Sequence, residues 1–200
     1  MNKAQFDAEA QGILQALPPE PKVVVIGSGS FWGHDTEQIC VAIGVQLATI
    51  ENLVMITGGI TGIGEAVGRS FCTARSNSGL NAQTYHILPR GSGEWDYGVT
   101  LHGGDTMEDR REILGRLAKM YISIEGGPGT VHEARVAQQE LAFLIPVART
   151  GGFSQDIYSR VECPRHKLVQ QWQTLNDPDA SVEEIGLSVL RIIRVLAKGN

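Results

Sequence analysis

Three times in this chain, a short apolar run ends in a glycine-rich loop that leads into a helix-like segment. The runs are residues 22–26, 53–57 and 121–124. Buried parallel strands read as near-continuous Val and Ile rather than as an alternating pattern. Strands that alternate with helices indicate a doubly wound parallel sheet of the Rossmann-like type, with helices on both faces. The sequence therefore predicts an α/β fold, and 200 residues suit a single domain.

The remaining apolar pattern extends this alternation to both ends of the chain. Further strands are predicted at residues 83–88, 98–101 and 143–147, and helices at 3–17, 34–50, 64–75, 105–119, 134–141 and 182–196. Asp105 with Glu108 resembles a capping box that opens one helix, and Ser181 with Glu184 opens the last. Ligands of such sheets bind at the carboxyl ends of the strands, where all three glycine loops are expected.

Charge and cysteine content narrow the classes of function. The net charge of −5 argues against nucleic acid as a partner, because phosphate-backbone binding requires a basic face. No apolar run approaches the roughly 20 residues that cross a bilayer, and no signal peptide is visible, so we expect no membrane attachment. Three widely spaced cysteines fit reduced thiols in the cytoplasm. Without metal-ligand spacing, we expect no metal and no cofactor.

The first two glycine loops do not match the common nucleotide motifs. Gly27 and Gly29 begin a dinucleotide fingerprint, but Trp32 occupies its third glycine position and no acid ends the second strand. No glycine run leads into Gly-Lys-Ser/Thr, so a P-loop is absent too. The glycines of residues 58–64 let the backbone approach a ligand, or simply pack strand against helix. Together the three loops are expected to line one cleft for a nucleotide-sized ligand.

The third loop, residues 125–133, is the strongest candidate for an anion site. A glycine loop that opens a helix presents backbone N–H groups at the positive end of the helix dipole, where phosphates bind. Pro128 has no N–H, so the donors are expected from Gly127, Gly129, Thr130 and Val131. Glu133 lies about a turn into the helix. It is either a reactive carboxylate beside the phosphate or a charge that interacts with the dipole, worth about 0.3–1 kcal/mol.

Two adjacent arginines, Arg110 and Arg111, fall in the first turns of the helix expected from Asp105. A cation there is mildly unfavourable against the helix dipole. A guanidinium aimed at a phosphate or carboxylate would explain the placement. The alternative is a surface ion pair with Glu108 or Asp109, which contributes little stability.

These motifs together resemble the LONELY GUY family, Rossmann-like proteins long labelled lysine decarboxylases. Residues 107–111 resemble the family's M-x-x-R-K segment, and residues 125–133 resemble its P-G-G-x-G-T-x-x-E loop. The glycines of residues 58–64 resemble its earlier loop, and Gly27 with Ser28 its first. The resemblance covers about residues 22–148. It implies one domain over residues 1–200, with residues 1–21 and 149–200 as helical extensions.

The resemblance implies a phosphoribohydrolase that releases the free base from a nucleoside 5′-monophosphate. By position, Arg110 and Glu133 match the family's essential arginine and glutamate. The implied phosphate and ligand contacts are Gly27, Ser28, Gly58, Gly59, Gly62, Arg111, Gly126, Gly127, Gly129 and Thr130. The implied partner is a nucleotide-like small molecule, and the implied assembly is a homodimer or a higher homo-oligomer.

Two positions depart from the family pattern. Arg111 replaces a lysine, and Glu125 replaces a proline. The Glu125 carboxylate would either repel a phosphate or accept ribose hydroxyls, so we treat it as a ligand contact. The wider superfamily also contains nucleotide sensors of the ADP-ribose-binding type and carriers of the molybdenum cofactor. A non-catalytic sensor or carrier therefore stays open, with Trp32, Trp95 or Tyr97 stacking on the ligand.

Overall fold

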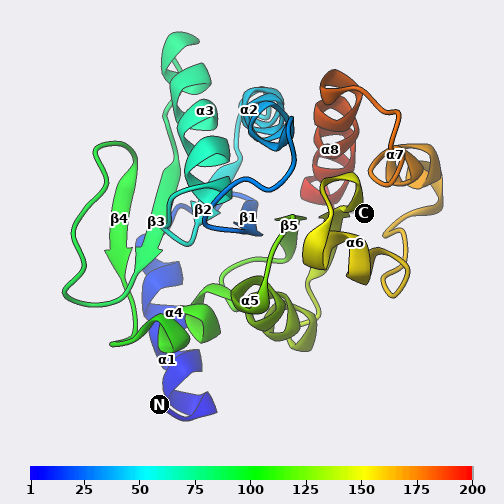
Figure 1. Ribbon diagram of the computed structural model, residues 1–200. Coiled ribbons are helices and arrows are strands. Elements are labelled where there is room, and N and C mark those ends of the chain that lie inside the picture. The colour runs from blue at the N-terminus through cyan, green and yellow to red at the C-terminus, as the bar shows by residue number, and fades with distance from the viewer. Residues whose placement is uncertain (200) are drawn as a thin grey trace.

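A six-stranded parallel sheet forms the centre of the protein in the computed structural model, which describes residues 1–199 (Figure 1). The strand order is β4-β3-β2-β1-β5-β6. The strands are β1 Lys22–Gly27, β2 Val54–Thr57, β3 Thr84–Leu88, β4 Val99–His102, β5 Met120–Ile124 and β6 Phe143–Val147. The predicted α/β fold with a doubly wound parallel sheet is confirmed.

Helices cover both faces of the sheet because its central strands, β1, β2 and β5, are buried on both sides. The helices are α1 Lys3–Ala16, α2 Thr36–Leu47, α3 Ile63–Asn77, α4 Met107–Leu114, α5 Pro128–Gln139, α6 Gly152–Tyr158, α7 Val169–Thr174 and α8 Val182–Ala197. Val23 and Val25 of β1 face the core beneath α2, α3 and α8. Val24 and Ile26 face the opposite core, beneath α1, α4 and α5 (Figure 1).

The direction of winding reverses between β1 and β5, which are neighbours in the middle of the sheet. Their carboxyl ends are in register, with Gly27 opposite Ile124. The first and third glycine loops therefore leave the sheet side by side, and the second leaves β2 on the other flank of β1. Such a reversal opens a crevice where ligands of doubly wound sheets bind.

The helix after β4 differs from its prediction at both ends. Its N-cap is Thr106, whose side chain and that of Asp109 form the capping box, so the predicted box of Asp105 with Glu108 is wrong. The helix ends at Leu114, with Gly115 as its C-cap, rather than near Lys119. The predicted capping box of Ser181 with Glu184 at α8 is confirmed.

Several short elements were not predicted. The 3-10 helices Ala148–Thr150 and His166–Leu168, together with α6 and α7, fill the region between β6 and α8. Within residues 1–199, no helix combines the length and apolarity needed to cross a membrane.

Candidate functional site

The third glycine loop turns sharply between β5 and α5. We call residues 125–130 the anion loop. Glu125 and Gly126 both have positive φ angles, 51° and 104°, and α5 begins at Pro128 with Gly127 as its N-cap. The first-turn N–H groups of Gly129 and Thr130 have no acceptor inside the helix, so they are available to an anion. Val131 is not, because its N–H donates to the Gly127 carbonyl at 3.1 Å.

The switch-point cavity lies between the ends of β1 and β5 and has a volume of about 260 Å³. It brings together nine of the predicted site residues, namely Gly27, Ser28, Trp32, Arg110, Arg111, Gly127, Gly129, Thr130 and Glu133. Gly29, Ser30, Ile60 and Pro128 complete its lining. The first loop, the anion loop and the start of α4 therefore meet at one cavity, as the motifs predict.

The other predicted glycines lie outside this cavity. Gly58 lines an adjoining recess of about 50 Å³, which Arg110 and Glu133 also line. Gly62 is the N-cap of α3, and its backbone packs so closely on the first loop that an added Cβ would lie 2.5 Å from the Gly29 carbonyl carbon. Gly126 shapes the anion loop, and its carbonyl accepts from the Phe153 N–H at 2.9 Å.

Arg110 and Glu133 form a buried ion pair at the cavity. The Arg110 guanidinium donates from Nη1 to Oε1 of Glu133, and the two side chains are 1% and 7% exposed. Burial raises the pKa of the Glu133 carboxyl, and the guanidinium partly offsets this rise. Burial likewise lowers the pKa of Arg110, against the attraction of Glu133. Among residues 1–199, none donates a hydrogen bond to Oε2 of Glu133.

The second glycine loop packs against the Arg110 side of this ion pair. A Cβ added at Gly58 would lie 2.6 Å from Nη1 of Arg110, so only glycine lets the guanidinium rest against this backbone. Because the Arg110 guanidinium is buried and paired with Glu133, filling that space would push it away from its partner. The loop thus fixes where the guanidinium can lie.

We expect Gly58→Ala to lower the free energy of unfolding by about 1–3 kcal/mol, because the added methyl group overpacks the site. The matched control is Gly64→Ala in the same segment, where an added Cβ meets its nearest neighbour at 3.6 Å. Urea unfolding of both variants would measure the difference. Equal midpoints for the two variants would contradict the close approach of Gly58 to Arg110.

Arg111 supplies a cation that has no partner among residues 1–199. Its Nε and Nη2 would each lie 3.2 Å from a Cβ at Gly129, so the guanidinium lies alongside the anion loop. Within the described residues it makes no ion pair or hydrogen bond. Asp109 caps α4 instead of pairing with an arginine. A free guanidinium beside free N–H groups favours a phosphate or carboxylate ligand.

Glu125 is fully buried and does not line the switch-point cavity. Its carboxylate accepts from the Ser28 hydroxyl at 2.5 Å and from the N–H groups of Trp32 and Gly33 at 2.8 and 2.9 Å. Ligand contact at Glu125 stays a prediction, while the structure gives its oxygens these partners. Its φ of 51° is closed to proline, whose ring fixes φ near −65°.

The segment after β6 holds the anion loop from the other side. The Glu125 N–H donates to the Thr150 hydroxyl at 2.8 Å, and the Ser154 N–H and hydroxyl donate to the Glu125 carbonyl at 3.0 and 2.9 Å. Neither Thr150 nor Ser154 was predicted from the sequence to take part in the site. Both are hydroxyl residues close to Gly151 and Gly152, a pattern that is equally common in surface loops. Only the structure shows that they are buried.

Trp95 and Tyr97 pack under the second glycine loop rather than into the cavity. Trp95 donates from Nε1 to the Gly59 carbonyl at 3.0 Å, and both rings contact His86. His86 Nε2 faces the Tyr97 carbonyl at 3.0 Å, so that nitrogen carries the proton and Nδ1 accepts from Thr57. Burial lowers the pKa of His86. His86 was not predicted from the sequence to join these rings, and the cluster supports the loop structurally.

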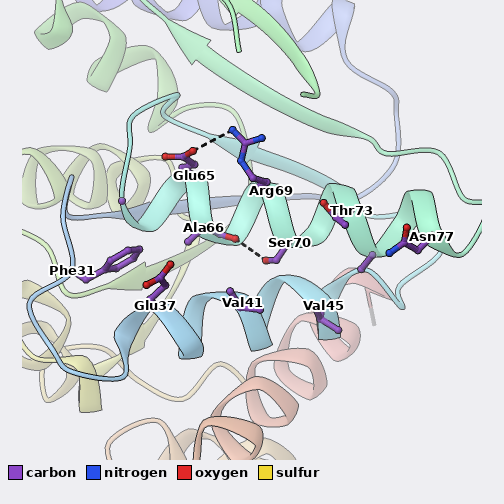
Figure 2. Close-up of a pocket in the computed structure, with 12 residues that line it drawn as sticks. Phe31, Glu37, Val41, Val45, Glu65, Ala66, Arg69, Ser70, Thr73 and Asn77 are labelled. Atoms are coloured by element: carbon purple, nitrogen blue, oxygen red, sulfur yellow. Dashed lines mark hydrogen bonds and ion pairs between the residues drawn. The ribbon is translucent and has the colours of Figure 1, made fainter. Parts of the chain in front are cut away.

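A more spacious hollow, about 670 Å³, is a groove between α2 and α3. Figure 2 shows Val41 and Val45 of α2 facing Ala66 and Thr73 of α3 across it. Its one cation, Arg69, is paired with Glu65 and Asp96. The groove therefore offers an anion no unpaired charge, unlike the switch-point cavity.

Comparison with sequence models of known protein families identifies the family of this chain. The sequence model of the SLOG cluster4 family matches residues 20–176. The chain belongs to the SLOG cluster4 family. This confirms the resemblance to the LONELY GUY-like, Rossmann-like superfamily. No curated protein matches the sequence.

Solved structures share the fold of this SLOG cluster4 protein. The X-ray structure of TM1055 is 27% identical, with a TM-score of 0.59, over 72% of this chain and 82% of TM1055. A structure of the molybdenum cofactor carrier protein from Chlamydomonas reinhardtii is 19% identical, with a TM-score of 0.51, over 62% of this chain and 74% of the carrier. Another structure of that carrier is 17% identical, with a TM-score of 0.51, over 88% and 99%.

Proposed function

We propose that this SLOG cluster4 protein binds a nucleoside 5′-monophosphate and hydrolyses its N-glycosidic bond, releasing the base. The observation that carries the proposal is the buried Arg110–Glu133 pair, which lines the same cavity as the anion loop. Buried, perturbed titratable groups that face a cleft are typical of functional sites.

The phosphate would bind at the anion loop. The Gly129 and Thr130 N–H groups, the Thr130 hydroxyl and Arg111 all converge on this side of the cavity. At about 260 Å³, the cavity is smaller than the roughly 300–1,000 Å³ of most ligand sites. It suits the phosphate and ribose, and the base would lie at its mouth.

The chemistry would belong to Glu133. As the bond between C1′ and the base nitrogen breaks, the base leaves with the electron pair and takes up a proton, and a water oxygen bonds to C1′. The sugar gains oxocarbenium character, which a nearby carboxylate stabilises. Oε1 of Glu133 is held by Arg110, while Oε2 has no partner within residues 1–199 and can face the sugar or the water.

A non-catalytic sensor or carrier of a nucleotide-like ligand is the second candidate. Trp32 favours it, because this ring lines the cavity yet is 55% exposed and so offers a stacking surface. The similar Chlamydomonas protein is a molybdenum cofactor carrier. Its sequence identity to this chain, 19%, supports a common fold.

Incubation with nucleoside 5′-monophosphates, diphosphates and ADP-ribose tests both candidates. Chromatography would detect released base, and thermal melting would detect binding, since a ligand that binds only the native state raises Tm. Base release supports the hydrolase. A rise in Tm with the ligand unchanged supports the carrier, and the absence of both effects would overturn both proposals. The homo-oligomer, the exclusion of nucleic acid and the cytoplasmic location stay predictions.

A further inference from the structure

Glu125 joins three segments around the switch-point cavity. Its carboxylate binds the first loop, its N–H binds Thr150, and its carbonyl binds Ser154. Every polar group of this fully buried residue therefore has a protein partner. A buried carboxylate is stable only when donors satisfy it in this way. The contacts account for the buried charge without any contact to a ligand.

The tip of the first loop depends on Glu125. Oε1 accepts both the Trp32 and the Gly33 N–H, at 2.8 and 2.9 Å. No other acceptor for these two N–H groups occurs among residues 1–199. The base of the loop is tied separately, since the Ser28 carbonyl accepts from the Ile63 N–H at 3.1 Å. Removing the carboxylate would therefore leave the Trp32 and Gly33 N–H groups without their acceptor, while the base of the loop stays attached.

The Trp32 ring packs on two glycines that leave room for it. A Cβ at Gly152 would lie 2.6 Å from Cζ3 of the indole, and one at Gly127 would lie 3.9 Å from Cη2. The ring thus lies against the anion loop on one side and lines the cavity. A fixed apolar wall keeps water from a bound anion, and charge interactions strengthen where water is excluded.

We propose that Glu125 is a positioning residue that holds residues 28–33 against the anion loop, so that Trp32 walls the phosphate subsite. This rests on the proposed function only in taking the switch-point cavity as the phosphate site. Glu125, which stands where the family pattern has proline, would thus affect ligand binding indirectly, through the position of Trp32.

The test compares Glu125→Ala with Glu125→Gln in the full chain labelled with 5-fluorotryptophan. The chain has three tryptophans, and Trp32→Phe assigns the Trp32 signal in the fluorine NMR spectrum. In Glu125→Ala we expect only the Trp32 signal to shift, and binding of orthophosphate and AMP to weaken by up to about 100-fold. Glu125→Gln should restore both, because its amide oxygen can accept the two N–H groups while its NH2 donates to Ser28.

The control is Glu37→Ala, which removes an exposed carboxylate at the start of α2 and should change neither reading. An unchanged Trp32 signal in folded Glu125→Ala would overturn the proposal. Trp32→Ala gives a second test that keeps Glu125: orthophosphate binding as tight as in the wild type would also overturn it. Failure of the wild type to bind either probe would count against the proposed function, and the Trp32 signal would still decide the positioning role.

Discussion

Replacing Glu133 with glutamine is expected to slow base release from nucleoside 5′-monophosphates by about 10²–10³-fold. The amide is neutral, so it cannot stabilise the positive charge that develops on the sugar, although its shape is nearly unchanged. Phosphate binding should persist, because among residues 1–199 the Glu133 side chain makes no hydrogen bond to the anion loop or to Arg111. Single-turnover release of the base would measure the rate, with circular dichroism confirming that the variant is folded.

The matched control for this variant is Glu140→Gln, which changes the carboxylate at the C-cap of the same helix. It should retain wild-type turnover. Full base release by Glu133→Gln would exclude Glu133 as the catalytic carboxylate and favour the carrier.

The pH dependence of base release gives a further test of Glu133. Burial raises the pKa of Glu133 above its ordinary value of 4.5. Only the ionised carboxylate stabilises the transition state, so base release should fall as the pH drops through this raised pKa. The acid limb of kcat/KM should therefore have its midpoint above 4.5. The acid limb should be absent from the pH profile of any activity that Glu133→Gln retains.

The second large effect concerns stability. We expect Arg110→Met to lower the free energy of unfolding by about 3–5 kcal/mol, because it leaves the Glu133 carboxylate buried without its partner. The double variant Arg110→Met with Glu133→Leu should recover most of that loss, since replacing a whole buried pair with apolar groups is often neutral or stabilising. Urea unfolding of the single and double variants would measure both values.

A stable but inactive double variant would show that the ion pair serves the site and not the fold. Additive losses in the double variant would contradict this interpretation. They would mean that the two side chains pack independently of their charges.

The strands and their loops were predictable because burial on both faces demands unbroken apolar runs, as in Val23, Val24 and Val25. The start of α4 could not be predicted from the sequence. Asp105 and Thr106 are both good N-caps, and each has an acid three residues later, so the local pattern permits either box. The elements α6 and α7 escaped prediction because seven and six residues are too short to show a helical period.

At the site, the sequence predicted which residues gather but not what each one contacts. Arg110 and Glu133 lie on different helices, and no local pattern shows that a guanidinium from α4 reaches α5. Glu125 is a clearer case. Its main partner, Ser28, is 97 positions away, and the two meet only because β1 and β5 are neighbours in the sheet. From the sequence alone, its carboxylate could therefore be interpreted only as a possible ligand contact.

The central position of β1 also has a consequence for synthesis of the chain. During synthesis, β5 follows its neighbour β1 by roughly 90 residues, which is about 5–20 s at common translation rates. Throughout that interval, one edge of an apolar strand lacks its native neighbour on the ribosome. An unpaired edge of this kind recruits other strands. The nascent chain is therefore exposed to aggregation at this edge until β5 emerges.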